Sequence, residues 1–273
     1  MNRESASLTE WLQTPLGRYL LQWETAQLEL AVSDIFGYHA LQLGLAELDA
    51  LGNNRMPHRW LAVGQVPDAA TGNAPLATPN KRTAALVTDS AALPFAQGSL
   101  DLLVLPHTLE LSADSHATLR EAERVLVPEG RMVITGFNPN SLWAFKQSRQ
   151  RLYQRWAGQH NFGAPALPCT KELIGYGRLR DWLRLLDFEV ESAHFGAYVP
   201  AVVSQKWLER FSWMDTLGPR WWPIFGAVYC VVAVKRVRGM RLLEPAKKSR
   251  KVPAVAPAAV ASKDAATSRR GRL

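Results

Sequence analysis

Two short apolar runs in the middle of this chain end in residues that could bind a ligand. The run at residues 84–88 stops at Asp89, and the run at residues 100–105 stops at Pro106 and His107. Ligands of open parallel sheets bind beyond the carboxyl ends of the strands, so these residues are expected to share one site. A carboxylate there accepts hydrogen bonds, and an imidazole with an ordinary pKa of about 6.5 exchanges protons near neutral pH.

The elements that must position these residues alternate between helix and strand. Apolar residues near the 3.6 period predict one long helix over about residues 7–32. Further helices are predicted at residues 45–51, from Ser112 or Asp114 to about 126, and at 179–186. Short strands are predicted at residues 38–45, 60–63, 84–88, 100–105, 131–136, 188–192 and 227–234. This alternation predicts an α/β fold, a mostly parallel sheet with helices on both faces. The candidate strand-end residues are Gly44, Gln65, Asp89, Pro106, His107, Gly136, Phe137 and Asn138.

The stretch from Asp89 to Phe137 carries several motifs in a fixed order. They are Asp89, Leu93-Pro94-Phe95, Asp101, His107 and the turn Arg124-Val125-Leu126-Val127-Pro128-Glu129-Gly130. In this order and spacing the chain resembles class I S-adenosylmethionine-dependent methyltransferases over residues 34–243. The segments RLRDWLRLLDFEV and WWPIFGAVYCVVAVKRVRGMRL resemble a proteobacterial branch of that family. The resemblance implies a Rossmann-like seven-stranded sandwich and S-adenosylmethionine as the cofactor.

The resemblance also implies roles for the residues around the third strand. Asp89 would accept a hydrogen bond from the exocyclic amine of the adenine, Ser90 would present its backbone N–H to a ring nitrogen, and Leu93 would pack on the ring. The alternative for Asp89 is an ordinary acid where a strand enters a turn. Asp101 and Arg124 are expected to be structural, Arg124 by tying the turn together.

The first glycine motif of the family is degenerate here. Family members follow the first strand with an acid and three alternating glycines, whereas this chain has Gln42 and Gly44 alone. Gln65 stands where the second strand normally ends in an acid for the ribose hydroxyls. Tyr38 or His39 would add to this half of the cofactor site. The alternative for Gly44 is a plain turn at a strand end.

The role of His107 stays open among three interpretations. It would be a general base, a wall of the cofactor pocket beside Pro106, or a helix-start histidine whose hydrogen bonds are satisfied by the protein. Methyl transfer from a sulfonium depends on alignment more than on an acid or base, so the reaction does not require a catalytic residue. No metal site is predicted, because Cys169 and Cys230 match no ligand spacing and are expected to be free thiols.

Charge divides the chain into two parts. Residues 235–273 contain twelve basic residues (Lys and Arg) and two acidic ones (Asp and Glu). The rest of the chain contains 20 basic and 22 acidic residues. We therefore expect a methyltransferase domain at residues 1–243 and a disordered basic, Pro/Ala-rich tail at 244–273. The tail would be a solubilising extension or a weak contact to nucleic acid or anionic lipid.

The location of the protein is predicted from its apolar runs. The N-terminus lacks the apolar run of a signal peptide. The apolar run at residues 221–234 is shorter than the roughly 20 residues of a membrane span. A buried strand is favoured there over an interfacial anchor. These features predict a cytoplasmic protein with no membrane span.

Three functions are compatible with these observations. The leading hypothesis is methyl transfer from S-adenosylmethionine to an unidentified O, N or C acceptor, held by the N-terminal helix and residues 141–156 and 198–222. The second is a binding protein that keeps the fold without catalysis, which the degenerate glycine motif favours. The third is an RNA-associated modifier that uses the tail together with Lys146, Arg149, Arg151 and Arg155. The sequence does not indicate an oligomeric state.

Overall fold

The computed structural model describes residues 3–64, 84–157, 167–168, 173–201 and 205–236. The chain divides into two compact units, Met1–Val237 and Arg238–Leu273. The second unit and the predicted tail at residues 244–273 lie outside the described residues. The boundary at residue 243 therefore stays a prediction.

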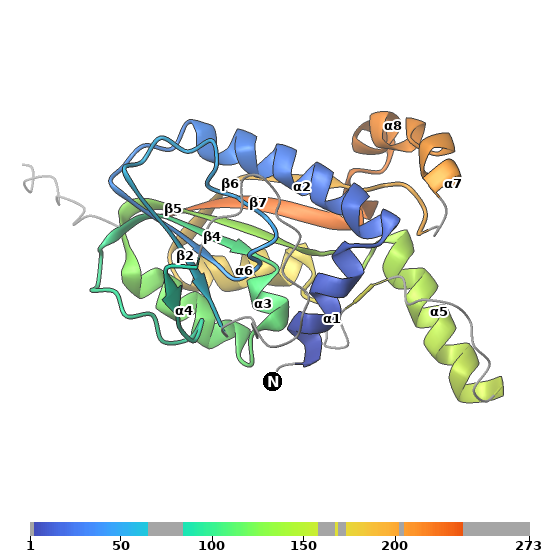
Figure 1. Cartoon of the computed structure of the whole chain (residues 1–273), viewed down its shortest axis with the longest axis horizontal. Helices are drawn as coiled ribbons and strands as arrows, with labels where there is room; N and C mark the ends of the chain where they lie inside the picture. The colour runs from blue at the N-terminus through green and yellow to red at the C-terminus, as the bar shows by residue number, and fades with distance from the viewer. Residues whose placement is uncertain (1–2, 65–83, 158–166, 169–172, 202–204, 237–273) are drawn as a thin grey trace, which may run out of the picture. The chain divides into compact units, whose positions relative to one another are not determined.

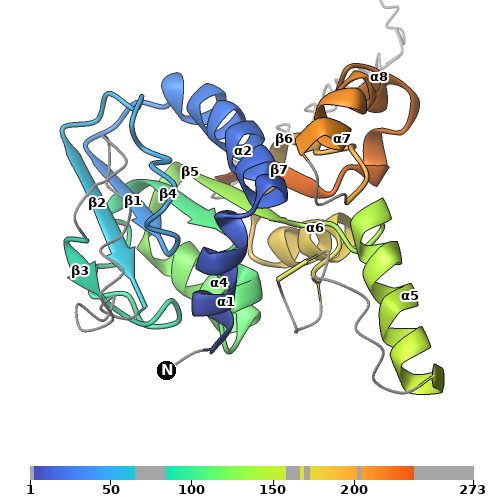
Figure 2. The same cartoon turned by 45° about the vertical axis from the view of Figure 1, so that its right-hand side comes forward.

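One sheet organises the first unit, and its seven strands follow the order β3-β2-β1-β4-β5-β7-β6 (Figures 1 and 2). The strands are β1 (His39–Leu43), β2 (His58–Val63), β3 (Leu86–Val87), β4 (Leu100–Pro106), β5 (Leu126–Phe137), β6 (Phe188–Gly196) and β7 (Val228–Lys235). Neighbours among β1 to β5 pair in parallel, and β7 is antiparallel to β5 and β6. The predicted mostly parallel seven-stranded sheet is confirmed.

Helices connect and cover these strands. They are α1 (Arg3–Leu12), α2 (Pro15–Ser33), α3 (Thr108–Leu111), α4 (Ser115–Val125), α5 (Leu142–Ala157), α6 (Tyr176–Leu185), α7 (Gln205–Arg210), α8 (Trp213–Trp221) and the 3-10 helix η1 (Pro223–Phe225). Asp114 caps α4 by accepting hydrogen bonds from the backbone N–H groups of His116 and Ala117. Within the described part of the chain, no helix combines the length and apolarity that crossing a bilayer requires.

The predicted single helix at the N-terminus is two helices separated by a corner. Thr14 caps α2 by accepting a hydrogen bond from Gly17 N, and Pro15 occupies the first helical turn. At Gly17 a Cβ atom would lie 2.4 Å from the carbonyl oxygen of Trp11, so the two helices approach more closely than a side chain would permit. The apolar period continues across the corner, which is why the sequence predicted one helix.

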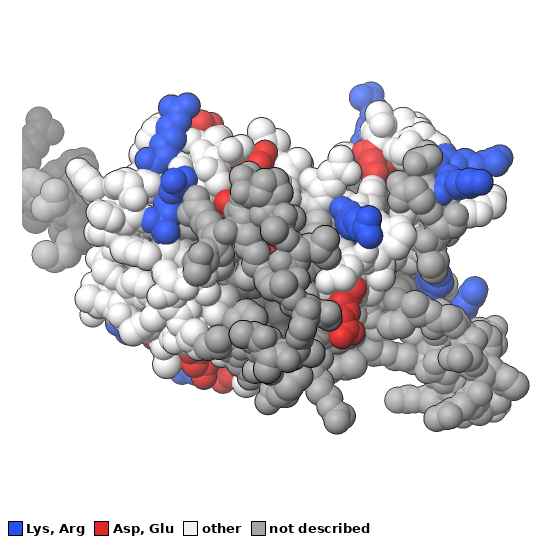
Figure 3. All heavy atoms as spheres, in the orientation of Figure 1, with Lys and Arg blue, Asp and Glu red and all other residues white. Residues whose placement is uncertain are grey.

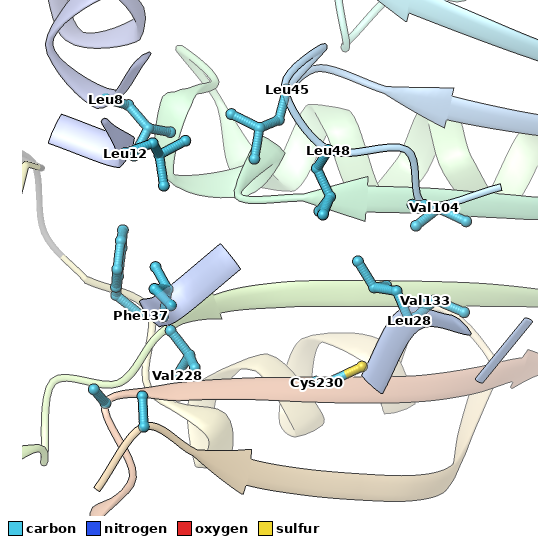
Figure 4. Close-up of a cluster of buried hydrophobic side chains, with 14 of the residues drawn as sticks. Leu8, Leu12, Leu28, Leu45, Leu48, Val104, Val133, Phe137, Val228 and Cys230 are labelled. Atoms are coloured by element: carbon cyan, nitrogen blue, oxygen red, sulfur yellow. The ribbon is translucent and has the colours of Figure 1, made fainter. Parts of the chain in front are cut away.

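The two faces of the sheet carry separate cores. Alternate residues of β4 supply them, with Leu102 and Val104 on the α1–α2 face and Leu103 and Leu105 on the α4–α6 face. Figure 4 shows the first core, where Val104 and Val133 come from neighbouring strands and Leu28 of α2 lies beside Val133. Helices on both faces were predicted and are confirmed.

The connection from β1 to β2 departs from the prediction. Residues 45–51 form turns instead of a helix, and β2 begins after this irregular loop. Leu45 has a φ of 21°, outside the helical region. Leu45, Leu48 and Leu51 are nevertheless buried. Their helix-like spacing therefore reflects a loop folded onto the core.

Candidate functional site

The carboxyl ends of β1, β2 and β4 meet at one edge of the sheet. Gln42 is in register with Leu61 of β2 and Val104 of β4, so the residues after these strands lie side by side. Gly44 has a φ of +87°, a left-handed conformation that favours glycine. A Cβ atom at Gly44 would lie 3.3 Å from Thr108 Oγ1. Gly44 therefore lies at the predicted edge, close against the start of α3.

Thr108 ties the ends of β1 and β4 together. Its hydroxyl donates a hydrogen bond of 2.6 Å to the carbonyl oxygen of Leu43 and is also 3.4 Å from the carbonyl oxygen of Pro106. Both Thr108 and Pro106 are buried. Pro106 thus lies where the sequence predicted, within the edge of the sheet, with its carbonyl engaged locally.

Gln42 fixes the loop that follows β1. Its Nε2 donates hydrogen bonds to the carbonyl oxygens of Leu45 (3.0 Å) and Leu48 (2.6 Å), and its Oε1 accepts one from Ala50 N (3.0 Å). The side chain is 2% exposed. Both amide hydrogens are used, so the expectation that Gln42 binds the cofactor directly is corrected. Its carboxamide stabilises the loop backbone instead.

Helix α1 covers the apolar side of this loop. In Figure 4, Leu45 and Leu48 lie next to Leu8 and Leu12 of α1, and all four are buried in one cluster. Thr9 Oγ1 adds a hydrogen bond of 3.1 Å to the loop at Glu47 Oε1. This half of the edge is therefore closed by the chain's own side chains.

The turn after β3 is open to solvent. Asp89 is exposed, and its Oδ1 accepts a hydrogen bond of 3.0 Å from Ala91 N. Ser90 Oγ lies 3.2 Å from Ser112 Oγ and 3.0 Å from Thr118 Oγ1, which connects the turn to α4. Asp89 and Ser90 are thus placed together at a strand end, as predicted from their motif.

Arg124 clamps this turn to α4. Its guanidinium donates to the carbonyl oxygens of Leu93 (3.1 Å) and Phe95 (2.9 Å) and to Glu121. Glu121 in turn accepts a hydrogen bond from Leu93 N, and its pKa is lowered by the hydrogen bond from Arg124. The predicted structural role of Arg124 is confirmed. Leu93 is 5% exposed and packs in the core of the α4–α6 face, so its predicted contact with an adenine ring stays a prediction.

Tyr38 and His39 belong to the opposite edge of the sheet. They lie at the amino end of β1, where the backbone N–H groups of both donate hydrogen bonds of 2.9 Å to Asp101 Oδ2. The assignment of Tyr38 to the cofactor site is therefore wrong, and the same geometry rules out His39 there. The structural role predicted for Asp101 is confirmed. Gln65 lies outside the described residues.

His107 ends β4 inside a buried cluster of charged groups. Its Nε2 is 2.7 Å from Glu24 Oε1 of α2, and its Nδ1 is 3.0 Å from Glu110 Oε2 of α3. The ring is 0% exposed and lies 4.3 Å, between centroids, from the ring of Phe137. Glu110 also accepts a hydrogen bond from Phe137 N. We call Glu24, His107 and Glu110 the buried triad.

The charges of the buried triad follow from their surroundings. Burial lowers the pKa of His107, but the attraction and hydrogen bonds of the two carboxylates outweigh it and raise that pKa to about 10. Burial raises the pKa of Glu110. His107 is therefore protonated at neutral pH and has no exposed atom. Of the three interpretations of His107, this geometry matches the satisfied histidine at a helix start.

Sequence reasoning missed both carboxylates of the triad. Glu24 lies in a stripe of α2 in which every fourth residue is buried: Leu16, Leu20, Glu24, Leu28 and Val32. A charged residue in the middle of such a stripe is the signal that could have revealed it, because charges are buried only when paired. Glu24 Oε2 has no hydrogen-bond partner among the described residues.

A shallow hollow of about 320 Å³ lies elsewhere on the described surface. Its lining includes Gln27 and Asp34 of the α2 region, Arg131 near the amino half of β5, and His194 of β6. Arg131 pairs with Leu102, well before β4 ends. The hollow is therefore separate from the strand-end site.

Residues 62–134 match a protein family described as "Methyltransferase domain". The uncharacterized protein YafS of Escherichia coli (strain K12) is 29% identical over 182 residues, 66% of this chain and 65% of YafS. A demethylmenaquinone methyltransferase of Thermus thermophilus is 30% identical over 128 residues, 41% of this chain and 58% of the enzyme. The match thus spans less than two thirds of the length of either relative.

A solved structure shares the fold. A chain of the Haloferax volcanii complex between the Trm112 methyltransferase activator and a methyltransferase aligns with a TM-score of 0.54 at 18% identity, covering 84% of this chain and 96% of that one. The sheet order and strand-end site define a Rossmann-like class I methyltransferase fold. The region that matches the methyltransferase domain family, residues 62–134, includes the Asp89 turn and most of β5.

Proposed function

We propose that this protein transfers a methyl group from S-adenosylmethionine to an acceptor. The observation that carries the proposal is the Asp89–Ser90 turn, held by Arg124 at the carboxyl edge of the sheet inside the matched region. S-adenosylmethionine would supply a methyl group on a positively charged sulfur. The protein itself contributes position and surroundings, since such a transfer gains most from alignment.

The adenine half of the cofactor fits this edge. The exposed carboxylate of Asp89 can accept a hydrogen bond from an exocyclic amine, and Ser90 offers a backbone N–H beside it. Among the described residues, no atom lies within 4 Å of where a Cβ would stand at Gly64, which follows β2. These groups would hold and orient the adenine.

The methionine half does not fit while α1 is docked. Gln42 binds the loop backbone, and Leu45 and Leu48 occupy the space below α1. Donor binding therefore requires α1 and this loop to separate. The buried triad would then lie beneath the opened edge, its imidazolium held by two carboxylates and unable to accept a proton.

Isothermal titration with S-adenosylmethionine and S-adenosylhomocysteine tests the proposal. Asp89→Ala should weaken binding about tenfold, as expected for loss of a charge-assisted hydrogen bond. Asp34→Ala, an exposed acid at the end of α2, is the matched control and should bind like the natural chain. Absence of binding at millimolar ligand, or equal affinities for the two variants, would contradict the proposal.

A second function is favoured by the closed loop. A protein that keeps the methyltransferase fold but binds its ligands without turnover would tolerate Gln42 in place of the acid. Incubation with a donor carrying a radioactive methyl group and a cell extract distinguishes the two functions. Label transferred to an extract component supports catalysis, whereas donor binding with no transfer supports the binding protein.

A further inference from the structure

Large apolar side chains cluster on the surface of α7, α8 and η1. Seven of them are at least 40% exposed: Trp207, Trp213, Leu217, Trp221, Trp222, Ile224 and Phe225. We call these residues the aromatic face. Isolated exposed apolar residues are ordinary, but a cluster of this kind marks an interaction site. They are not among the strand-end residues described above, and the expectation that residues 198–222 help to hold the methyl acceptor stays a prediction.

The orientation of α8 is fixed from its inner side. Asp215 accepts hydrogen bonds from Tyr19 Oη (2.5 Å) and from Tyr198 N (3.0 Å). Gly218 lies against the ring of Tyr198, where a Cβ would be 2.3 Å from Tyr198 Cγ. These contacts turn the helix so that Trp213 and Trp221 point outward. The exposure of Trp213 and Trp221 is therefore consistent with the packing of the inner side of α8.

Positive charges border the aromatic face. Among the described side chains of α7 and α8, the cations Lys206, Arg210 and Arg220 are exposed, whereas the carboxylate of Asp215 is engaged on the inner side. The guanidinium of Arg210 lies 5.4 Å from the centre of the Trp207 ring. In the part of the surface where Figure 1 places α7 and α8, Figure 3 shows several Lys and Arg side chains and a smaller patch of Asp or Glu atoms.

We propose that the aromatic face docks the protein on an anionic lipid bilayer. Tryptophan favours the boundary between headgroups and acyl chains, and flanking Lys and Arg are attracted to anionic headgroups. On α8, Trp213, Leu217 and Arg220 share the outer side at helical spacing, the arrangement of a helix that lies in the plane of the interface. The docking does not depend on methyl transfer.

Sedimentation with vesicles of phosphatidylcholine, with and without phosphatidylglycerol, tests the proposal on the full chain. The natural chain should bind the vesicles that contain phosphatidylglycerol. Trp213→Ala/Trp221→Ala should lower the partition coefficient about tenfold or more, because interfacial binding scales with buried apolar area. Leu30→Ala/Phe36→Ala, which removes two exposed apolar side chains near the other end of α2, is the matched control and should bind normally.

Two further measurements separate docking through the aromatic face from binding through the basic C-terminal segment and from self-association. Brominated phospholipids should quench tryptophan fluorescence in the natural chain and less in the double variant. Arg210→Glu/Arg220→Glu should weaken binding to the anionic vesicles and flatten its salt dependence. Unchanged binding of both variants would overturn the proposal and assign the binding to the basic segment after residue 237. A dimer in solution that the Trp213→Ala/Trp221→Ala change dissociates would also overturn it, because a second copy would then cover the face.

Discussion

The carboxyl edge of the sheet has two halves, one around β3 and one around β1 and β4, which differ in whether their polar groups are exposed or buried. Around β3, polar groups stand exposed, and Arg124 holds the turn from behind. Around β1 and β4, the chain buries its polar groups against one another, with Gln42 bonded to the loop and His107 between two carboxylates. The β3 half therefore leaves polar groups exposed on a turn that is held in place, whereas the β1–β4 half, which we call the sealed half, is stabilised by contacts within the chain. The sealed half is where substitutions should cost most.

The largest effect is expected at the centre of the buried triad. His107→Gln leaves two carboxylates buried without their cation, which should lower the free energy of unfolding by about 3–5 kcal/mol. Urea denaturation followed by circular dichroism measures the loss. His58→Gln, at an exposed position on β2, is the control and should change stability little. Equal stability of the two variants would mean that the triad is not buried as described.

The pH dependence of stability should report the same triad. The pKa of His107 rises from 6.5 to about 10 on folding, so its stabilising contribution is complete below pH 6.5 and is lost as the pH rises through about 10. The raised pKa of Glu110 acts in the same direction. Unfolding free energies measured between pH 6 and pH 10 should fall more steeply for the natural chain than for His107→Gln. Parallel curves would exclude a protonated His107.

A smaller loss of stability is expected from a substitution at Gln42, in the sealed half. Gln42→Glu introduces the acid that the resemblance to methyltransferases implies at this position, but it replaces two N–H donors with oxygens that face the carbonyls of Leu45 and Leu48. The free energy of unfolding should fall by about 2 kcal/mol. Gln22→Glu, exposed on α2, provides the comparison. If Gln42→Glu instead leaves the free energy of unfolding unchanged and strengthens donor binding, the loop after β1 opens readily. The difference in stability between the two halves of the edge would then be small.

The smallest effect is expected at Arg124, which holds the exposed turn after β3 in place. Arg124→Ala removes the clamp on the turn that presents Asp89 and should weaken binding of S-adenosylhomocysteine about threefold, through position alone. Arg120→Ala, an exposed arginine on the same helix, is the matched control. Titration calorimetry on both variants measures the difference. A loss as large as that of Asp89→Ala would mean that Arg124 contacts the ligand itself.

The sequence predicted the open half better than the sealed half. Asp89, Ser90 and Arg124 belong to one short continuous motif, so local order was enough to place them. Their strands were also predicted, because apolar runs of that length are buried in parallel sheets. The roles of Arg124 and Asp101 followed from the same motif.

The sealed half depends on contacts between distant residues. Glu24 reaches His107 across 83 positions of the chain, and no local pattern encodes that pairing. The helix predicted at residues 45–51 failed because a buried glutamine supplies hydrogen bonds that a helix would have made within itself. Tyr38 was misplaced although the strand predicted at residues 38–45 already put it at the amino end, opposite the edge where ligands of parallel sheets bind.

The placement of Glu24 has a consequence for how the molecule comes apart. Helix α2 precedes the whole matched domain in the chain, and such terminal helices often open independently of the rest. Here the detachment of α2 would remove Glu24 and leave the buried His107 imidazolium with only the carboxylate of Glu110. Amide hydrogens of α2, β4 and β5 should therefore exchange as one cooperative unit. Helix α2 is therefore, in folding terms, part of the sheet that it covers.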